Sequence, residues 1–400
     1  MPTPPDLATT IRFWFEQIQV PFHPWTREAV AAALDNPRDY PHLYEAWIPG
    51  DRIALAVGPL LPDPIPLIGH VVDYLIARGL EPQQLHVVLA NDSSRFRDGL
   101  IESLAKWKLQ PSQVTNHDPF DEKKLEFLAA DMEANPVYVN REMMEADLVL
   151  PIVGFRNPKA LSYFGPQALV PWFVDHQTQR RLRTLTVDAT DAGIKQRRQF
   201  GEWVARLAGI ACVLGIVPSH KPECMALASG DPHSIEQHWI THRAAQDING
   251  LREMENRQAS DWVLAHIGSS TEFISWNELA CVLTELLPQL SDQGNLILCS
   301  SISRRVQGAL KLLGSTDSDD ELEKKLLKSE LPNALAAFLI WHALQSCHIY
   351  LMSSHERDAL ESIHIGRIEQ IDPILRLTGQ SQQGTILANA LVDCQSFYTP

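Results

Sequence analysis

The chain has 400 residues, of which 45% are hydrophobic and 21% are charged, and its formal net charge is −15. This composition is typical of a soluble globular protein, and the length predicts two domains rather than a single core. The negative charge disfavours nucleic acids and anionic membrane surfaces as partners, because both require a basic surface.

The sequence is not expected to carry a membrane span or a signal peptide. It contains no apolar run long enough to span a bilayer, and the opening MPTPPDLATT lacks the basic and apolar regions of a signal peptide. The six cysteines are scattered without a CxxC pair, and several lie in apolar strings such as GIACVLGIV. Buried, reduced thiols and a cytoplasmic location are therefore expected.

The first elements in chain order form a strand–loop–helix–strand unit. Residues 11–34 are predicted to be helical, with a break at Pro24, and 51–60 form a strand that enters a proline-rich turn. The helical spacing of 67–80 should end at Gly79, and a second buried strand follows. The loops after such strands are where open α/β folds keep ligands.

The same alternation continues to about residue 258. The predicted order is a strand, a helical turn, a strand, a helix, a strand and a mostly helical stretch, at residues 136–140, 141–146, 147–155, 197–209, 210–218 and 228–258.

The pattern then restarts with the strand DWVLAHIG. A helix, a strand, a helix and a strand follow, at residues 275–290, 294–301, 333–346 and 348–354, and the charged segment 314–330 is interpreted as a solvated loop that leads into a short helix. We therefore predict two α/β domains, 1–255 and 256–400, with a hinge between about 250 and 262 and a cleft between the domains.

Several segments resemble the nickel-dependent lactate racemase family, whose members racemise or epimerise 2-hydroxy acids. The similar segments are DRIALAVGPLLPDPIPLIGHVVDYLIARGLEPQQLHVVLAND, NPVYVNREMMEADLVLPIVGF, ACVLGIVPSHKPECMALASGDPHSI, SWNELACVLTELLPQLSDQGNLILCSS and HIYLMSSHERDALESI. The NREMMEADLV part is the most specific. The resemblance covers roughly residues 50 to 390 and is stronger in the first half.

The resemblance implies two α/β domains of lactate-racemase type with the active site in the cleft between them. In the family, a nickel pincer nucleotide is tethered as a thioamide on a lysine, and nickel is held by the pincer and a histidine. Two further histidines exchange the substrate proton, and an arginine and a lysine handle the substrate carboxylate.

The family positions in the first two loops are altered in this chain. The arginine of the family loop Ser-Asp-x-Thr-Arg-Pro falls on Leu61, which lacks the fork that binds a carboxylate through two hydrogen bonds. In the family motif Gly-Thr-His-Arg, the histidine falls on Ser94, whereas the arginine is retained as Arg95. A serine hydroxyl does not accept a proton near neutral pH without a base of its own.

The later family positions differ as well. One histidine falls near Asn157 or Pro158, the tethering lysine falls near Gln167, and a Gln-x-x-Lys pair falls on Glu278 and Cys281. A glutamine has no amine from which to form the thioamide. His176 follows closer than expected for the nickel ligand, and Lys159 precedes the turn at Gly165.

The loop ANDSSRF allows two interpretations. Its polar side chains could cap the next helix, or they could line a ligand site at the end of the strand, and Arg95 could bind an anion or pair with Asp92 or Asp98. The ligand-binding candidates of the chain are therefore Asn91, Asp92, Ser94, Arg95, Lys159 and His176.

The helix HWITHR places His238 and His242 four residues apart on one face, which is the spacing of a zinc site. The usual general-base glutamate is absent, because Trp239 follows His238, so surface histidines are the preferred interpretation.

Three functions remain open. The first is a lactate-racemase-like pseudoenzyme that binds a small hydroxy acid or a catalytic relative and carries no cofactor. The second is an active 2-hydroxy-acid racemase or epimerase that uses Arg95, Lys159 and His176, with the nickel pincer nucleotide. The third is a metal-dependent hydrolase or lyase built on His238 and His242.

Overall fold

The computed structural model describes residues 11–12, 15, 25–90, 93–154, 156, 160–217, 226–246, 259–267, 274–300, 302–315, 318–379, 383–390 and 394–398. The chain divides into an N-terminal unit, His23–Pro218 with Met225–Arg243, and a C-terminal unit, Met1–Phe22 with Ser219–Cys224 and Ala244–Pro400. The predicted boundary between residues 255 and 256 lies outside the described residues. None of the described helices has the length and apolar character that a membrane crossing requires.

The N-terminal unit is built on a six-stranded sheet of order β3-β2-β1-β6-β7-β8. Every strand pair is parallel except β7 and β8. Strands β1, β6 and β7 are buried at every position, as is usual for a parallel sheet covered on both faces. The strands are β1 (Ile53–Val57), β2 (Leu85–Leu89), β3 (Val114–Asn116), β6 (Leu148–Val153), β7 (Val213–Val217) and β8 (Ala226–Gly230).

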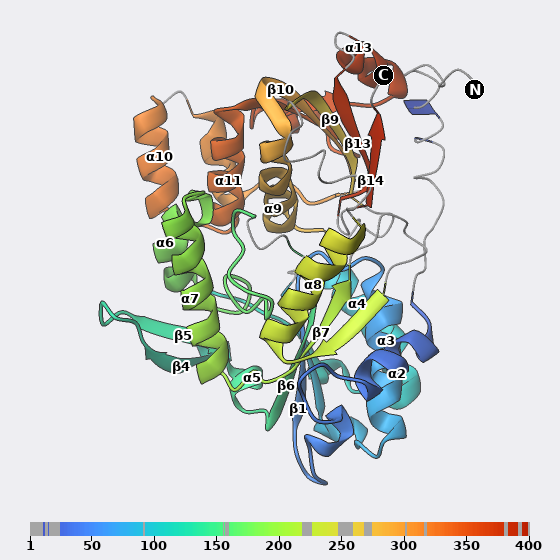
Figure 1. Cartoon of the computed structure of the whole chain (residues 1–400). Coiled ribbons are helices and arrows are strands. Elements are labelled where there is room, and N and C mark those ends of the chain that lie inside the picture. The colour runs from blue at the N-terminus through green and yellow to red at the C-terminus, as the bar shows by residue number, and fades with distance from the viewer. Residues whose placement is uncertain are drawn as a thin grey trace, which may run out of the picture. The chain divides into compact units, whose positions relative to one another are not determined.

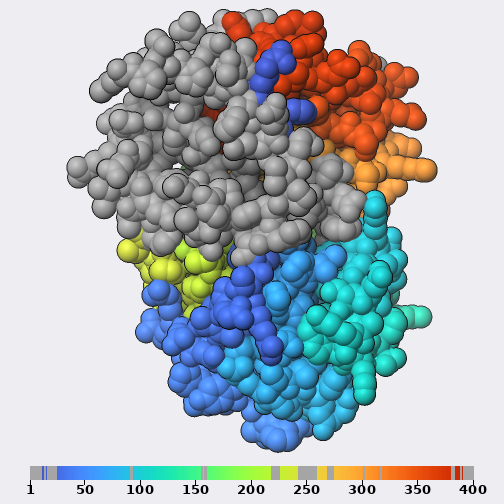
Figure 2. All heavy atoms as spheres, turned by 90° about the vertical axis from the view of Figure 1, so that its right-hand side faces the viewer, coloured from blue at the N-terminus to red at the C-terminus, as the bar shows by residue number. Residues whose placement is uncertain are grey.

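Helices α2, α3 and α4 lie together on one side of this sheet (Figure 1). Figure 2 shows the unit from that side, where the blue and cyan segments lie next to one another. Gly79, with a φ of +95°, follows the end of α3, as predicted. The helices of the unit are α2 (Arg27–Asp35), α3 (Pro64–Ala77), α4 (Ser94–Leu104), α5 (Arg141–Met144), α6 (His176–Leu182), α7 (Asp191–Leu207) and α8 (Pro232–Gln246), with short 3-10 turns η1 (Leu43–Glu45), η2 (Pro82–Gln84), η3 (Ala105–Trp107), η4 (Pro111–Gln113), η5 (Glu122–Lys124) and η6 (Thr184–Val187).

Two elements of this unit differ from the sequence prediction, and one predicted strand lies outside the main sheet. The strand predicted at 136–140 exists as β5 (Pro136–Asn140), but it pairs only with β4 (Leu125–Ala130) in a separate two-stranded antiparallel sheet. Residues 228–230 belong to β8 rather than to a helix. Helix α7 starts at Asp191, earlier than predicted, because the Thr190 side chain accepts the Gly193 N–H.

The C-terminal unit repeats the architecture, with a sheet of order β12-β11-β10-β9-β13-β14 in which only β13 and β14 are antiparallel. Both predicted helices and all three predicted strands of this half are present. The strands are β9 (Ser260–His266), β10 (Leu290–Cys299), β11 (Cys347–Met352), β12 (Gly366–Ile368), β13 (Gly384–Asn389) and β14 (Cys394–Tyr398). The helices are α9 (Trp276–Leu286), α10 (Asp319–Lys328), α11 (Ala334–Leu344), α12 (Arg357–Glu361) and α13 (Ile371–Thr378), with the 3-10 turns η10 (Leu287–Gln289) and η11 (Gly308–Gly314).

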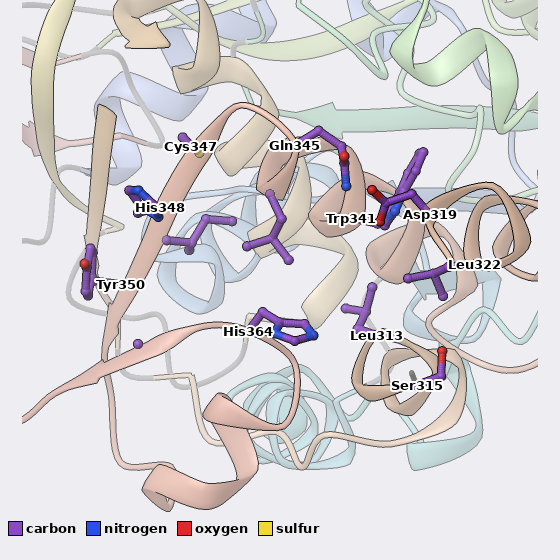
Figure 3. Close-up of a pocket in the computed structure, with 13 residues that line it drawn as sticks. Leu313, Ser315, Asp319, Leu322, Trp341, Gln345, Cys347, His348, Tyr350 and His364 are labelled. Carbon is purple, nitrogen blue, oxygen red and sulfur yellow. The ribbon is translucent and has the colours of Figure 1, made fainter. Parts of the chain in front are cut away.

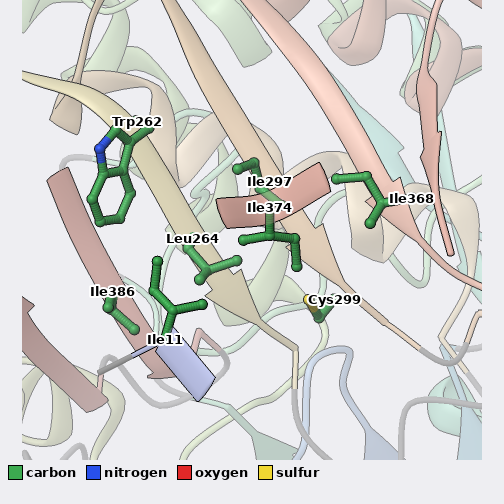
Figure 4. Packing of buried hydrophobic residues seen from close by; sticks show 8 residues of the cluster. All are labelled: Ile11, Trp262, Leu264, Ile297, Cys299, Ile368, Ile374 and Ile386. Carbon is green, nitrogen blue, oxygen red and sulfur yellow. The ribbon is translucent and has the colours of Figure 1, made fainter. Parts of the chain in front are cut away.

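The core of the C-terminal unit includes a residue from the start of the chain. Ile11 packs in one buried cluster with Leu264 and Ile386, around the sheet residues Trp262 and Ile297 (Figure 4). The sequence prediction had placed residues 1–22 in the N-terminal domain. Ile11 instead completes an apolar surface of the second sheet, where it is fully buried.

Candidate functional site

The carboxyl edge of the N-terminal sheet is where the topology favours a ligand site. Strand β1 lies between β2 and β6, and successive connections run away from β1 in opposite directions on its two sides. Open α/β sheets bind ligands in the crevice at such a switch point. The side chains in the loops that follow β1 and β6 therefore determine which ligands this edge can bind.

The loop after β1 is apolar and lies directly on the end of β6. The Gly58 N–H donates to the Ile152 carbonyl at 2.8 Å, and a Cβ on Gly154 would lie 2.7 Å from the Leu60 carbonyl oxygen. Leu60 and Leu61 are buried, and Leu61 is only 7% exposed. The position where the resemblance places a carboxylate-binding arginine is therefore an apolar wall.

The loop between β6 and α6 is buried along residues 160–174, except for the half-buried Ala168. Ala168 lies against Gly58, 3.7 Å from the place of a Cβ there. Gln167 is 8% exposed, and its Oε1 would be 2.6 Å from a Cβ on Gly165, whose φ is +120°. This backbone conformation favours glycine. Because residue 165 has no side chain, the carboxamide of Gln167 has room to fold back over the turn.

Helix α7 holds this loop by direct backbone contact. A Cβ on Gly201 would collide with the Phe164 carbonyl oxygen, so the helix and the loop approach more closely than any side chain at 201 would allow. The loop can pack this closely against α7 only because residue 201 has no side chain.

A buried polar network fixes the same loop to helices α7 and α8. The Tyr163 hydroxyl donates to Glu236 Oε1 at 2.7 Å, and Arg198 donates to Glu236 Oε2. Glu236 is 1% exposed. Burial, followed by the adjacent Glu236 carboxylate, raises the pKa of Tyr163 well above its usual value, so Tyr163 is a neutral donor.

Buried arginines hold backbone carbonyls around the loop. Arg156 donates to the Leu161 carbonyl at 3.3 Å, and Arg197 donates to the carbonyls of Leu185 and Asp188, both at 2.5 Å. Burial lowers the pKa of Arg197, and the Asp188 carboxylate opposes this shift. The Arg156 contact holds the loop, whereas the Arg197 contacts hold the η6 turn that follows α6.

The segment NREMMEADLV has a structural role at its first residue. The Asn140 side chain caps α5 by accepting the Glu142 N–H at 3.1 Å, and its amide approaches His117 Nδ1 at 3.3 Å. An amide N–H can only donate, so Nδ1 accepts, and Nε2 donates to the Val174 carbonyl at 3.1 Å. Burial lowers the pKa of His117 to about 4, which keeps the ring neutral.

The loop after β2 is a helix start. Ser93 accepts the Phe96 N–H at 3.1 Å and caps α4, so the capping interpretation applies to this serine. Ser94 and Arg95 are exposed, and Asp98 pairs with Arg97 at 3.1 Å. Asn91 and Asp92 lie outside the described residues.

The remaining candidates of the N-terminal unit are dispersed. His176 begins α6, its Nδ1 lies 3.2 Å from the Pro119 carbonyl oxygen, and its ring stacks on Phe120 at 4.8 Å. Asn157, Pro158 and Lys159 are not among the residues that the structure describes.

The histidine helix is present as α8. His238 Nε2 lies 3.5 Å from an Arg38 nitrogen, and the side chain of His242 is not described. Within the described part of the chain, no group of three or more His, Cys, Asp or Glu side chains is arranged to hold a metal ion.

The two residues on which the resemblance places a Gln-x-x-Lys pair, Glu278 and Cys281, are buried in helix α9. Glu278 accepts the Ser275 N–H at 2.8 Å, and Ser275 in turn accepts the Glu278 N–H at 3.2 Å, so the pair forms a capping box. Cys281 is fully buried. Glu278 therefore caps the helix, and Cys281 belongs to the buried core.

A pocket of about 650 Å³ lies elsewhere in this unit (Figure 3). It is bordered by the amino ends of β11 and β12 and by α10 and α11, and its polar lining includes Asp319, His348 and His364. The amino ends of parallel strands are the edge at which α/β sheets seldom carry their sites. Neither Glu278 nor Cys281 lines this pocket.

The carboxyl edge of the C-terminal sheet carries a polar group that the sequence analysis missed. Ser353 Oγ lies 2.9 Å from His355 Nδ1, and His355 Nε2 lies 2.5 Å from the Arg304 carbonyl oxygen. Trp276 donates to the same carbonyl at 3.0 Å. The sequence signal was SSHER directly after the apolar strand HIYLM, a polar loop at a strand end.

Comparisons with known proteins agree with this architecture. Residues 13–158 match the lactate racemase N-terminal domain. The structure of the lactate racemase apoprotein from Thermoanaerobacterium thermosaccharolyticum superimposes with a TM-score of 0.61 over 94% of each chain, at 11% sequence identity. A protein from Thermotoga maritima superimposes with a TM-score of 0.57 over 88% of this chain and 93% of that one, at 14% identity. No curated protein sequence matches the chain. At these identities the structural matches show a shared fold over most of the chain.

Proposed function

We propose that this chain, whose residues 13–158 match the lactate racemase N-terminal domain, is a lactate-racemase-like protein without nickel-pincer racemase activity. In this proposal it binds a small hydroxy acid or a catalytic relative. The observation that carries the proposal is Gln167, which is 8% exposed and folds over Gly165 at the position where the family resemblance places the tethering lysine.

The residues at the family positions do not fit a nickel pincer nucleotide. A carboxamide cannot form the thioamide link, and Leu61 has no donor for a carboxylate. Glu278 forms the capping box of α9 with Ser275, and Cys281 is fully buried. We therefore assign no step of chemistry to that group in this chain.

Arg95 is the residue that we assign to ligand binding. It is exposed in the first turn of α4, two residues after the capping Ser93, and the resemblance keeps an arginine at this position. The amino end of a helix and a guanidinium both favour a carboxylate. A small hydroxy acid provides one.

The proposal is tested by producing the chain together with the enzymes that make the pincer nucleotide. Intact-mass measurement should show the unmodified chain, and incubation with one lactate enantiomer should leave that enantiomer unchanged. An active lactate racemase produced in the same cells is the positive control. A nucleotide-sized mass increase, or conversion of the enantiomer by this chain, would overturn the proposal.

A further inference from the structure

We propose that Ser353 and His355 form a second reactive centre, in which Ser353 is a nucleophile towards small carboxylic esters and His355 is its general base. The centre lies within the C-terminal unit and does not depend on the function proposed above. The two side chains are 2.9 Å apart, within the range required of a nucleophile and its base.

The hydrogen bonds around His355 determine which nitrogen carries the proton. A backbone carbonyl can only accept, so the 2.5 Å contact of Nε2 with the Arg304 carbonyl requires a proton on Nε2. Nδ1 then has a free lone pair in the neutral ring. The Ser353 hydroxyl therefore donates to Nδ1, which is the direction of proton transfer needed to activate a serine.

The base is oriented by a carbonyl that is itself fixed. Trp276 donates to the Arg304 carbonyl at 3.0 Å and to the Arg305 carbonyl at 3.2 Å, and the Trp276 ring lies 5.4 Å from the His355 ring. A nucleophile, a base and a group that orients the base are the parts of an activated serine. Here the orienting group is a backbone oxygen.

The position in the fold also favours a reactive role. Ser353 follows β11, Arg304 lies in the segment after β10, and Trp276 begins α9 after β9. These three adjacent parallel strands all present their carboxyl ends at this edge, where α/β folds place their ligands. Ser353 is half-buried and His355 is buried, so the base is held while the hydroxyl retains some exposure.

A purely structural role exists for Ser353, because its Oγ also accepts the His355 backbone N–H at 3.4 Å. That contact makes a local turn and uses an oxygen lone pair. It leaves the hydroxyl proton directed to Nδ1, so the turn and the activated serine coexist. A turn alone would give no reaction at Ser353.

Water is the only reactant that the hydrolysis requires besides the ester. Ser353 Oγ forms a bond to the ester carbonyl carbon as its proton passes to His355 Nδ1. The carbon–oxygen bond to the leaving alcohol then breaks, and the alcohol takes that proton. Water, deprotonated by His355, attacks the acyl-serine, and the serine oxygen recovers the proton, which releases a carboxylic acid.

The first experiment uses the full-length wild-type protein and a fluorophosphonate, which phosphonylates activated serines. Peptide mass spectrometry should locate the label on Ser353 and not on its exposed neighbour Ser354. His355→Gln should abolish labelling in the same time. A label on another residue, or no label, would overturn the proposal without requiring any variant to fold.

The second experiment follows the hydrolysis of p-nitrophenyl acetate. We expect Ser353→Ala to lose the protein-dependent rate and His355→Gln to lower it by about 100-fold, the usual minimum for a general base. Ser354→Ala should keep the wild-type rate. Equal rates in wild type and Ser353→Ala would refute the assignment, provided that circular dichroism shows both proteins folded.

Discussion

Both sheets of this chain have six strands with one antiparallel pair at an edge, but the residues at their carboxyl edges differ in chemistry. At the edge of the N-terminal sheet, apolar residues follow β1 and a buried loop lies against them at Gly58. At the edge of the C-terminal sheet, a serine, a histidine and a backbone carbonyl are joined by short hydrogen bonds. The fold thus specifies where a site can be, and the loops specify whether reactive groups stand there.

The difference also concerns what the buried polar groups do. In the N-terminal unit, Tyr163, Glu236 and Arg198 satisfy one another and hold a loop in place. In the C-terminal unit, His355 connects a hydroxyl to a fixed carbonyl. The first arrangement stabilises structure, whereas the second leaves a proton acceptor next to a hydroxyl.

The largest expected effect is the loss of the network that holds the N-terminal loop. Glu236→Ala leaves Arg198 without this partner and removes the acceptor of Tyr163. Breaking a buried pair costs about 3–5 kcal/mol, and we expect about 3 kcal/mol because the Arg198 side chain retains 29% exposure. Urea unfolding measures this loss. Glu202→Ala, an exposed position on α7, is the control and should change stability little. An equally small effect at Glu236 would mean that the loop does not depend on this network.

A second prediction concerns the pH dependence of the stability of the N-terminal unit. His117 is neutral in the folded state with a pKa of about 4, against 6.5 for an ordinary histidine, so the unfolded chain binds a proton first as the pH falls. This stability is present above pH 6.5 and is lost as the pH falls towards 4, by about 3 kcal/mol in total.

The measurement is urea unfolding between pH 7 and 4 in wild type and His117→Gln. Glutamine can still accept from Asn140 and donate to the Val174 carbonyl, but it does not titrate. The pH dependence over this window should therefore decrease in the variant. An unchanged slope would show that His117 is not its source.

A third prediction concerns the close approach of α7 to the loop. Gly201→Ala improves helix propensity, but the added methyl collides with the Phe164 carbonyl, and we expect a net loss of about 2 kcal/mol. The exposed Gln199→Ala on the same helix is the control. A stabilised Gly201→Ala protein would show that the loop moves away easily, which would break the contrast between a fixed and a reactive edge.

The smallest expected effect tests whether the N-terminal edge still binds. Arg95→Ala should weaken the binding of a small hydroxy acid such as lactate by about tenfold, or about 1.5 kcal/mol, through loss of one charged hydrogen bond. Isothermal titration calorimetry compares it with Arg97→Ala, whose guanidinium pairs with Asp98. Equal affinities in wild type and Arg95→Ala would assign Arg95 a structural role.

Much of the fold could be predicted because its signals are local. Buried parallel strands give continuous apolar runs, such as IALAV in β1, and the glycine at 79 marks the end of a helix. Strands β3 and β12 were missed because three residues carry no periodicity. The longer strands β4, β13 and β14 were not predicted either. Strand β5 was predicted correctly as a strand, but its sequence does not identify β4 as its partner.

The site was harder to predict because its contacts join distant residues. His117 and Asn140 are 23 positions apart, and His355 and Arg304 are 51 positions apart. The backbone carbonyl of Arg304 also has no signature in a sequence. By contrast, the residue types at Leu61 and Gln167, where the resemblance places an arginine and a lysine, are given by the sequence itself.

The packing of Ile11 in the core of the C-terminal unit has a consequence for synthesis of the protein. Ile11 emerges from the ribosome early, but its neighbours Leu264 and Ile386 emerge much later. The N-terminal sheet can be complete while this isoleucine still lacks its binding surface. Ile11 therefore reaches its packing partners only after the last part of the chain has been made, and a fragment that begins at residue 256 would be made without a residue of its own core.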